Sequence, residues 1–104
     1  MGKVRWTEKA SKNLQAIHDF ISRDSKSYAH RFIKSLIKRT IRLEMLPYSG
    51  RIVPELESVG LREVIYRNFR IVYRVERGNE DIEILAVVHG AQDMSKTIRE
   101  EWEL

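Results

Sequence analysis

The chain has 104 residues, with 19 lysines and arginines against 15 acidic residues, 42% apolar residues and no cysteine. This length fits a single domain over residues 1–104 and excludes two independent ones. The lack of cysteine excludes a disulfide scaffold, a thiolate metal site and cysteine nucleophilic catalysis. Because no apolar run is long enough to cross a bilayer, we expect a globular, cytoplasmic protein with no membrane contact.

The charge is divided unevenly between the two halves of the sequence. Residues 1–52 hold 12 basic and 4 acidic side chains, whereas residues 53–104 hold 7 and 11. Such a field steers polyanions or an acidic protein towards the basic half, although solvated helices are also often basic without any ligand. Charge alone therefore leaves nucleic acid, an acidic partner and a plain solvated surface open.

The first half of the chain predicts a strand followed by two helices. Residues 3–6 alternate polar and apolar and lead into Thr7, a good helix N-cap. Apolar residues then recur every three or four positions, as on one helix face: Ala10, Leu14, Ile17 and Ile21. We expect this helix to stop between residues 23 and 26, and a second one to run from about Ser27 to a point before Pro47.

The second half predicts a loop and three strands. Residues 51–59 form an irregular loop around Pro54, and apolar runs at 61–66, 69–75 and 82–89 indicate strands. The last two strands are joined by a tight turn at Gly78–Asn79. The tail from Asp93 to Leu104 is expected to add a short helix.

These elements predict an α+β fold in the order β-α-α-β-β-β. Two amphipathic helices joined by a few polar residues form an antiparallel hairpin, whose apolar face needs a cover. We expect it to pack on one face of a small antiparallel sheet of about four strands.

A two-residue turn at Gly78–Asn79 would fix the register of the last hairpin. The facing pairs on one side are then all apolar: Val75 with Ile82, Tyr73 with Ile84, Ile71 with Ala86, and Phe69 with Val88. This face is expected to pack under the helices, because a one-residue slip would expose it. The opposite face carries Arg74 across from Glu83, and Arg70 with His89 as its diagonal neighbour.

Strand 61–66 has two candidate registers. A two-residue turn at Arg67–Asn68 would place Arg62 opposite Tyr73 on the core face, where an unpaired guanidinium is costly. We therefore expect an odd loop or a bulge, which sets Arg62 across from Arg74. One open sheet face would then gather four side chains: Arg62, Arg70, Arg74 and His89.

The chain also carries five segments whose order and spacing are similar to those of a known family. They are Leu46–Arg51, Val53–Leu56, Gly60–Glu63, Phe69–Val75 and Val87–Asp93. With the element order above, they resemble the toxin superfamily named for RelE and ParE over nearly the whole chain. The resemblance implies the toxin half of a bacterial type II toxin–antitoxin pair, a small protein that arrests growth unless a cognate acidic antitoxin binds it.

Members of the superfamily divide by target, and so do the roles that the resemblance implies. RelE-like and YoeB-like toxins cut mRNA in the ribosomal A site, whereas ParE-like toxins poison DNA gyrase and are not nucleases. Metal-free RNA cleavage needs a base, a cation for the phosphorane charge and an acid. By similarity to YoeB-like toxins, Glu55 is the candidate base, Arg70 the phosphate-binding arginine and His89 the acid.

Two further arginines belong to this set of candidates. Arg62 is a candidate second phosphate clamp, because a guanidinium presents a fork of donors to phosphate oxygens. Arg74 is either a third phosphate ligand or the cross-strand partner of Glu83. Glu55, Arg70 and His89 each also have a purely structural interpretation: a solvated loop acid, a sheet-surface or antitoxin contact, and a strand-end histidine.

The end of the last strand departs from the nuclease pattern. Gly90 stands after His89, where YoeB-like proteins end in a tyrosine, and Gly90–Met94 instead resembles ParE-like tails, with Gln92 where many have arginine. The three histidines show no metal-ligand spacing, so we predict neither a metal nor another cofactor.

Three functions therefore remain open. The first is a ribosome-dependent, metal-independent mRNA endoribonuclease that uses the four candidate side chains. The second is a ParE-like gyrase poison without nuclease activity. The third is a non-toxic relative that only binds a partner.

Overall fold

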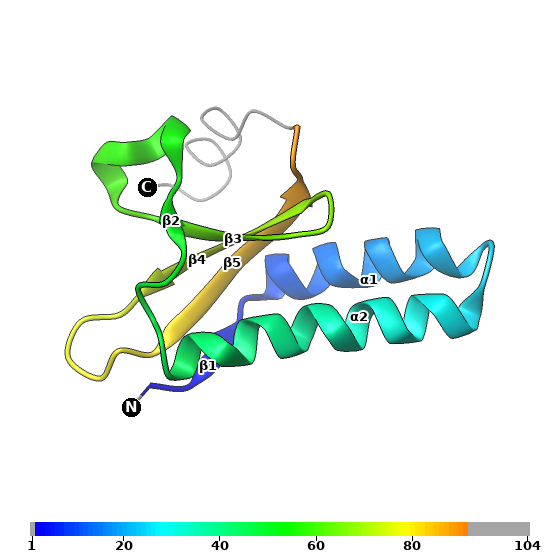
Figure 1. The fold of residues 1–104 in the computed structure, drawn as a ribbon, viewed down its shortest axis with the longest axis horizontal. Helices are drawn as coiled ribbons and strands as arrows, with labels where there is room; N and C mark the ends of the chain where they lie inside the picture. Colours follow the sequence, from blue (N-terminus) through cyan, green and yellow to red (C-terminus); the bar gives the residue numbers. More distant parts are fainter. Residues whose placement is uncertain (1, 92–104) are drawn as a thin grey trace.

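The computed structural model describes residues 2–91, without the side chains of residues 58 and 59. The helix expected at 93–104 lies outside this part. The elements in chain order are β1 (Val4–Trp6), α1 (Glu8–Ser22), α2 (Lys26–Ile41), η1 (Arg42–Glu44), β2 (Arg51–Ile52), η2 (Pro54–Val59), β3 (Arg62–Tyr66), β4 (Phe69–Val75) and β5 (Ile82–His89). The predicted α+β fold is confirmed (Figure 1).

The sheet has five strands in the order β1-β5-β4-β3-β2, and it is mixed. β1 runs parallel to β5, while the other neighbouring strands are antiparallel. The expectation of about four antiparallel strands is therefore corrected in two respects. The short β2 adds an edge strand, and the first strand joins the last one in parallel.

Both helices begin at side-chain caps. The hydroxyl of Thr7 accepts a hydrogen bond from the Ala10 N–H at 3.1 Å, and the hydroxyl of Ser25 accepts one from the Tyr28 N–H at 3.1 Å. Such caps satisfy N–H groups that have no partner inside the helix. Thr7, predicted as a cap, also donates to the Ile84 carbonyl at 3.0 Å, so the same residue ties the start of α1 to β5.

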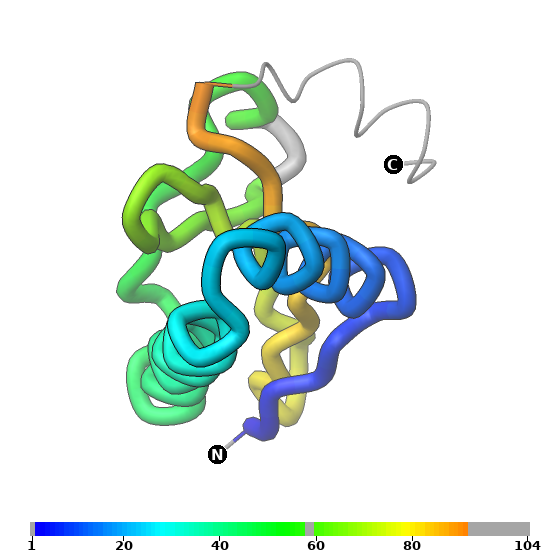
Figure 2. The backbone as a smooth tube through the Cα atoms, turned by 90° about the vertical axis from the view of Figure 1, so that its right-hand side faces the viewer, coloured from blue at the N-terminus to red at the C-terminus, as the bar shows by residue number. Residues whose placement is uncertain are grey.

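The sheet has an apolar cluster on each face. The larger one lies under the helices and is formed by Ala10, Phe32, Leu36, Leu43, Ile71, Tyr73, Ile82, Ile84 and Val87. The smaller one involves η2 and its flanks and contains Val53, Leu56, Leu61 and Val72. Figures 1 and 2 show the two helices side by side along one face, with the segment between β2 and β3 at the opposite side of the sheet. The face expected to be open is thus partly covered.

The predicted register of the last hairpin is right at the turn end and wrong beyond it. Val75 faces Ile82 and Tyr73 faces Ile84, as predicted, but a bulge in β5 then places Val72 opposite Ala86. An extra residue opposite the partner strand shifts every later pair by one. Phe69 therefore faces His89 instead of Val88, and Arg70 faces Val88.

The register chosen for β3 is also wrong. The β3–β4 hairpin closes with a two-residue turn, in which Arg67 has a left-handed φ of 57°, and Arg62 faces Tyr73. The reason is that the guanidinium has partners: its Nη1 donates to the carbonyls of Tyr48 at 3.1 Å and Gly50 at 2.7 Å. The free-energy cost of burying an unpaired guanidinium, which argued against this register, is therefore not incurred.

Tyr73 holds the loop before β2 against the sheet. Its hydroxyl donates to the Pro47 carbonyl at 2.8 Å and accepts from the Gly50 N–H at 2.9 Å. Burial raises the pKa of this hydroxyl above its ordinary value. Gly50 fits here because a Cβ on it would lie 2.6 Å from both the Tyr73 hydroxyl and the Glu63 carbonyl oxygen.

Within the described part of the chain, no helix is both long and apolar enough to cross a membrane.

Candidate functional site

Arg70 lies in a buried ion network on the face of the sheet opposite the helices. Its side chain is 6% exposed. Nη1 and Nη2 each donate to a Glu55 carboxylate oxygen at 2.7 Å, and Nε donates to Glu63 at 2.6 Å. The Glu55 carboxylate first, and Glu63 after it, raise the pKa of Arg70, while burial opposes them. The guanidinium is therefore held by two carboxylates inside the fold.

Glu63 is the acidic centre of this network. Its side chain is fully buried, and its other carboxylate oxygen accepts from Arg51 Nε on the neighbouring β2 at 2.6 Å. Glu63 is not among the site residues predicted from the sequence. It stands two positions from Ile65 on β3, so the alternation of the strand places both side chains on the same sheet face. A buried carboxylate requires partners, and here they come from β2 and β4.

Glu55 reaches the network from η2. Its carboxylate makes a bidentate pair with Arg70, the geometry in which a guanidinium–carboxylate contact is strongest. Proton abstraction by Glu55 would require this pair to open first. The structure thus brings Glu55 and Arg70 together, as the candidate site required, but as partners of each other.

His89 lies on the other face of the sheet. Because the bulge turns the end of β5 over, the imidazole stands beside Phe69, with ring centroids 5.9 Å apart, and its Nε2 is 3.3 Å from the Asn68 amide nitrogen. The expectation that His89 and Arg70 share a face is wrong. A proton donated by His89 and a cation at Arg70 would meet opposite sides of the sheet.

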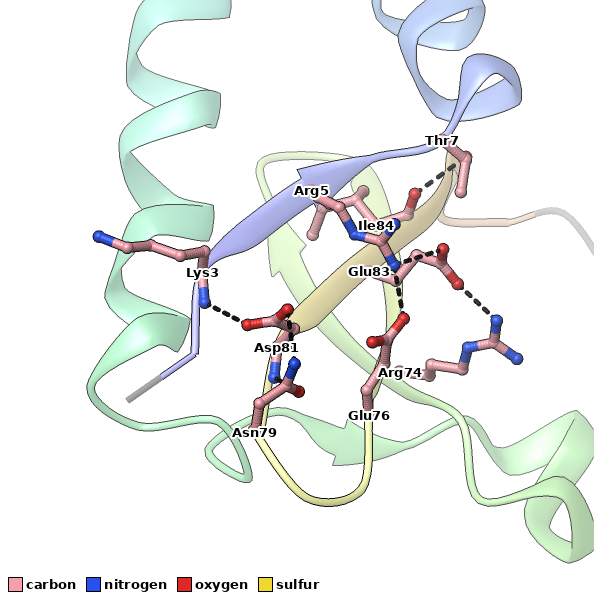
Figure 3. A network of polar contacts seen from close by, with 9 residues as sticks. All are labelled: Lys3, Arg5, Thr7, Arg74, Glu76, Asn79, Asp81, Glu83 and Ile84. Atoms are coloured by element: carbon pink, nitrogen blue, oxygen red, sulfur yellow. Dashed lines mark hydrogen bonds and ion pairs between the residues drawn. The ribbon is translucent and has the colours of Figure 1, made fainter.

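The two remaining candidates are engaged in structural contacts. Arg62 binds the two loop carbonyls, and its guanidinium carbon lies 5.2 Å from the centre of the Tyr48 ring. Arg74 donates to Glu83 at 2.6 Å, which confirms the cross-strand pair predicted for it. Figure 3 shows that Glu83 and Glu76 also bind Arg5 from β1, so this pair belongs to an ion network across three strands.

These positions decide what the arrangement can do chemically. The four candidate catalytic side chains are divided between two faces and the edge loop, and the two on one face neutralise each other. Among residues 2–91, no group of three or more His, Cys, Asp or Glu side chains could hold a metal ion.

A family model described as the ParE toxin of the type II toxin–antitoxin system, parDE, matches residues 4–94. The chain belongs to this family. A search of curated proteins found no match to this chain.

Two solved structures resemble this ParE-family chain. The chromosomal ParDE toxin–antitoxin system from P. aeruginosa has 26% sequence identity and a TM-score of 0.71, over 86% of this chain and 96% of that one. The RelBE2 toxin–antitoxin complex from Mycobacterium tuberculosis has 18% identity and a TM-score of 0.59, over 85% and 96%. The second likeness shows a shared fold alone.

This ParE-family chain has an apolar groove beside its two helices. It measures about 480 Å³ and lies between the two helices and the end of the β3–β4 hairpin. Phe32 and Phe69 line it, while Phe20 and Tyr28 stand 68% and 43% exposed at its sides. Exposed aromatic side chains gathered in this way are typical of protein contact surfaces and of ligand-binding grooves. Their signal in the sequence is that Phe20 falls outside the apolar stripe of α1.

Proposed function

We propose that this chain is a growth-arresting toxin that acts by binding DNA gyrase, and that a cognate antitoxin keeps it inactive. The observation that carries the proposal is the separation of the candidate catalytic groups. Arg70 and Glu55 are paired within the fold, and His89 stands on the opposite face. A nuclease would need these groups around one phosphate.

The family supports the same choice between targets. ParE-like toxins were expected to poison gyrase without cleaving nucleic acid themselves, and the matching family model and the 26% identical structure both carry the ParE name. The RelBE2 likeness supports only the fold. Toxicity would then depend on surface contacts instead of a reacting centre.

The apolar groove supports the antitoxin part of the proposal. Two guanidinium carbons lie close to its exposed rings, Arg23 at 5.8 Å from the Phe20 centroid and Arg31 at 5.9 Å from that of Tyr28. An amphipathic segment with acidic residues would bury apolar side chains in the groove and pair with these cations. We expect its gene to lie beside that of the toxin.

The test is expression without the antitoxin, with two readouts taken from the same culture. We expect gyrase-dependent DNA breaks with intact transcripts, and the arrest should disappear when the neighbouring gene is co-expressed. In vitro, the purified protein should inhibit supercoiling by gyrase and leave mRNA on translating ribosomes uncut.

His89→Gln separates the two targets without disturbing the fold, because this side chain is exposed. For a gyrase poison, growth arrest by the variant should equal that of the unmodified toxin. Transcripts cut at ribosomes by the unmodified toxin but not by His89→Gln would reject the proposal and restore the endoribonuclease.

A further inference from the structure

A second hollow, basic instead of apolar, lies between α2 and the β3–β4 hairpin. It measures about 260 Å³ and is lined by Ser35, Lys38, Arg39, Arg42 and Tyr66. Arg67, on the hairpin turn, extends it, since its guanidinium carbon is 6.0 Å from the centre of the Tyr66 ring. We call these six residues the α2 basic surface.

Within residues 2–91, no acidic side chain forms an ion pair with the four cations of this surface. From Lys26 to Leu43 the sequence holds six basic residues and no acidic one. By contrast, Arg5, Arg51 and Arg74 each have a carboxylate within 2.6 Å.

Unpaired like charges at this spacing lower stability. Lys38 and Arg42 stand one helical turn apart, and like-charge pairs at that separation are unfavourable. A bound polyanion would attract both side chains and offset their mutual repulsion. The arrangement is therefore more useful for binding an anion than for holding the fold together.

The lining indicates which kind of polyanion fits. An amphipathic protein segment docks by burying its apolar face in an apolar groove, and this hollow offers no aliphatic side chain for such a contact. It offers cations with two hydroxyl groups, from Ser35 and Tyr66, which are the donors that contact phosphate oxygens in nucleic-acid complexes. The apolar groove, which Phe32 and Phe69 line, better suits a protein segment.

We propose that the α2 basic surface binds the phosphodiester backbone of nucleic acid, with duplex DNA as its source. The choice of DNA rests on the proposed function, because gyrase holds duplex DNA and a toxin bound to it would meet that DNA. The surface reads charge and not sequence, since phosphate contacts carry no base information.

The direct test is binding of the purified full-length protein to a fluorescent DNA duplex of mixed sequence, measured by anisotropy in the absence of gyrase. Four phosphate contacts predict that log K falls with log salt with a slope of roughly −3.6. Lys38→Gln and Arg42→Gln should each weaken binding equally for unrelated sequences and reduce the slope by about 1.

Lys12→Gln is the matched control. It removes the same charge from the neighbouring helix, where Lys12 is exposed and already pairs with Glu8 at 3.1 Å. Its affinity and salt slope should equal those of the unmodified protein. An equal loss in Lys12→Gln and Lys38→Gln would overturn the proposal, because the binding would then reflect net charge alone.

Two further probes identify the ligand. Poly-glutamate that binds as tightly as the duplex, with the same dependence on Lys38 and Arg42, would overturn the proposal in favour of an acidic polypeptide. An RNA duplex that binds more tightly than DNA would confirm the phosphodiester and overturn DNA as its source. Because gyrase is absent, failure to bind nucleic acid leaves the gyrase proposal intact, and failure to inhibit gyrase leaves this result intact.

Discussion

The charged side chains of this protein differ in what they contribute because they differ in burial. Arg70 is almost completely buried and held by two carboxylates, whereas Arg74 is 47% exposed and makes one contact. Exposed ion pairs are worth about 0–1 kcal/mol, since water and salt screen them. Removing one partner of a buried pair leaves an uncompensated charge, which costs far more.

Arg70→Ala should therefore destabilise the protein by about 3–5 kcal/mol, because Glu63 and Glu55 lose the cation between them. Arg74→Ala, the control on the same strand, should cost about 1 kcal/mol or less. Urea unfolding followed by circular dichroism measures both. Equal stability of the two variants would show that Arg70 does not hold the fold, and would make it available again as a phosphate ligand.

Between elements, long-range contacts to single side chains fix the loops. The loop that precedes β2 is attached to β4 by the Tyr73 hydroxyl and to β3 by the Arg62 guanidinium. Both contacts join the segment after η1 to strands that follow it by 12 or more residues. This loop sets the position of β2, and with it of the Arg51 side chain that completes the buried network.

Tyr73→Phe should cost about 1–3 kcal/mol at neutral pH, because the Gly50 N–H loses its acceptor. It should also change the response to alkali. The raised pKa of Tyr73 means that the folded state holds this proton more tightly, so its contribution is complete below about pH 10 and is lost as pH rises through the folded pKa.

Unfolding free energies measured between about pH 7 and 11 test this. The difference between the unmodified protein and Tyr73→Phe should shrink with rising pH. A difference that stays constant up to the highest pH would mean that the hydroxyl titrates normally in the folded state.

How far the sequence predicts this architecture depends on the element. Helix stripes and caps are local, so both helices and the Thr7 cap were predictable. The bulge in β5 was not, because Leu85, Ala86, Val87 and Val88 are all apolar and both faces of the sheet have an apolar cluster. Either register buries apolar residues, so hydrophobicity does not choose between them.

The prediction of the candidate site depended on the one-residue bulge in β5, which the sequence does not determine. A shift of one position moves His89 to the other face of the sheet. His89 is thereby separated from Arg70, although the predicted RNA cleavage required the two side chains to lie together. Arg62 was misplaced for a related reason: its acceptors, the carbonyls of Tyr48 and Gly50, lie in a loop whose course no local pattern indicates. Pairs that are local, such as Arg74 with Glu83 across a tight hairpin, were predictable.

At the scale of the whole molecule, the parallel strand β1 forms one edge of the sheet. It covers the edge of β5 and adds Trp6 and Val4 to the margin of the larger cluster. Lys3 N–H donates to Asp81 at 2.8 Å, and the Ile82 N–H donates to the Lys3 carbonyl at 2.8 Å. Without β1, the backbone groups of β5 would form an open edge, which favours association between chains.

Deletion of residues 1–6 should therefore lower the thermal midpoint and produce oligomers in size-exclusion chromatography. Arg5→Ala is the control, because it removes the exposed ion pairs of β1 and leaves its backbone in place. That variant should remain monomeric, with a loss of about 1 kcal/mol or less. A deletion variant as stable and monomeric as Arg5→Ala would show that β1 is dispensable.

The pairing of β1 with β5 also determines how late during synthesis the chain can complete its sheet. Lys3 and Asp81 are 78 positions apart, and peptide bonds are made at about 5–20 per second, so roughly 4–16 s pass before the second of them is synthesised. Throughout that interval the nascent chain lacks the strand on which both helices and β1 depend. We therefore expect a product that terminates before β5 to lack the folded sheet, and with it the surfaces that the complete sheet positions.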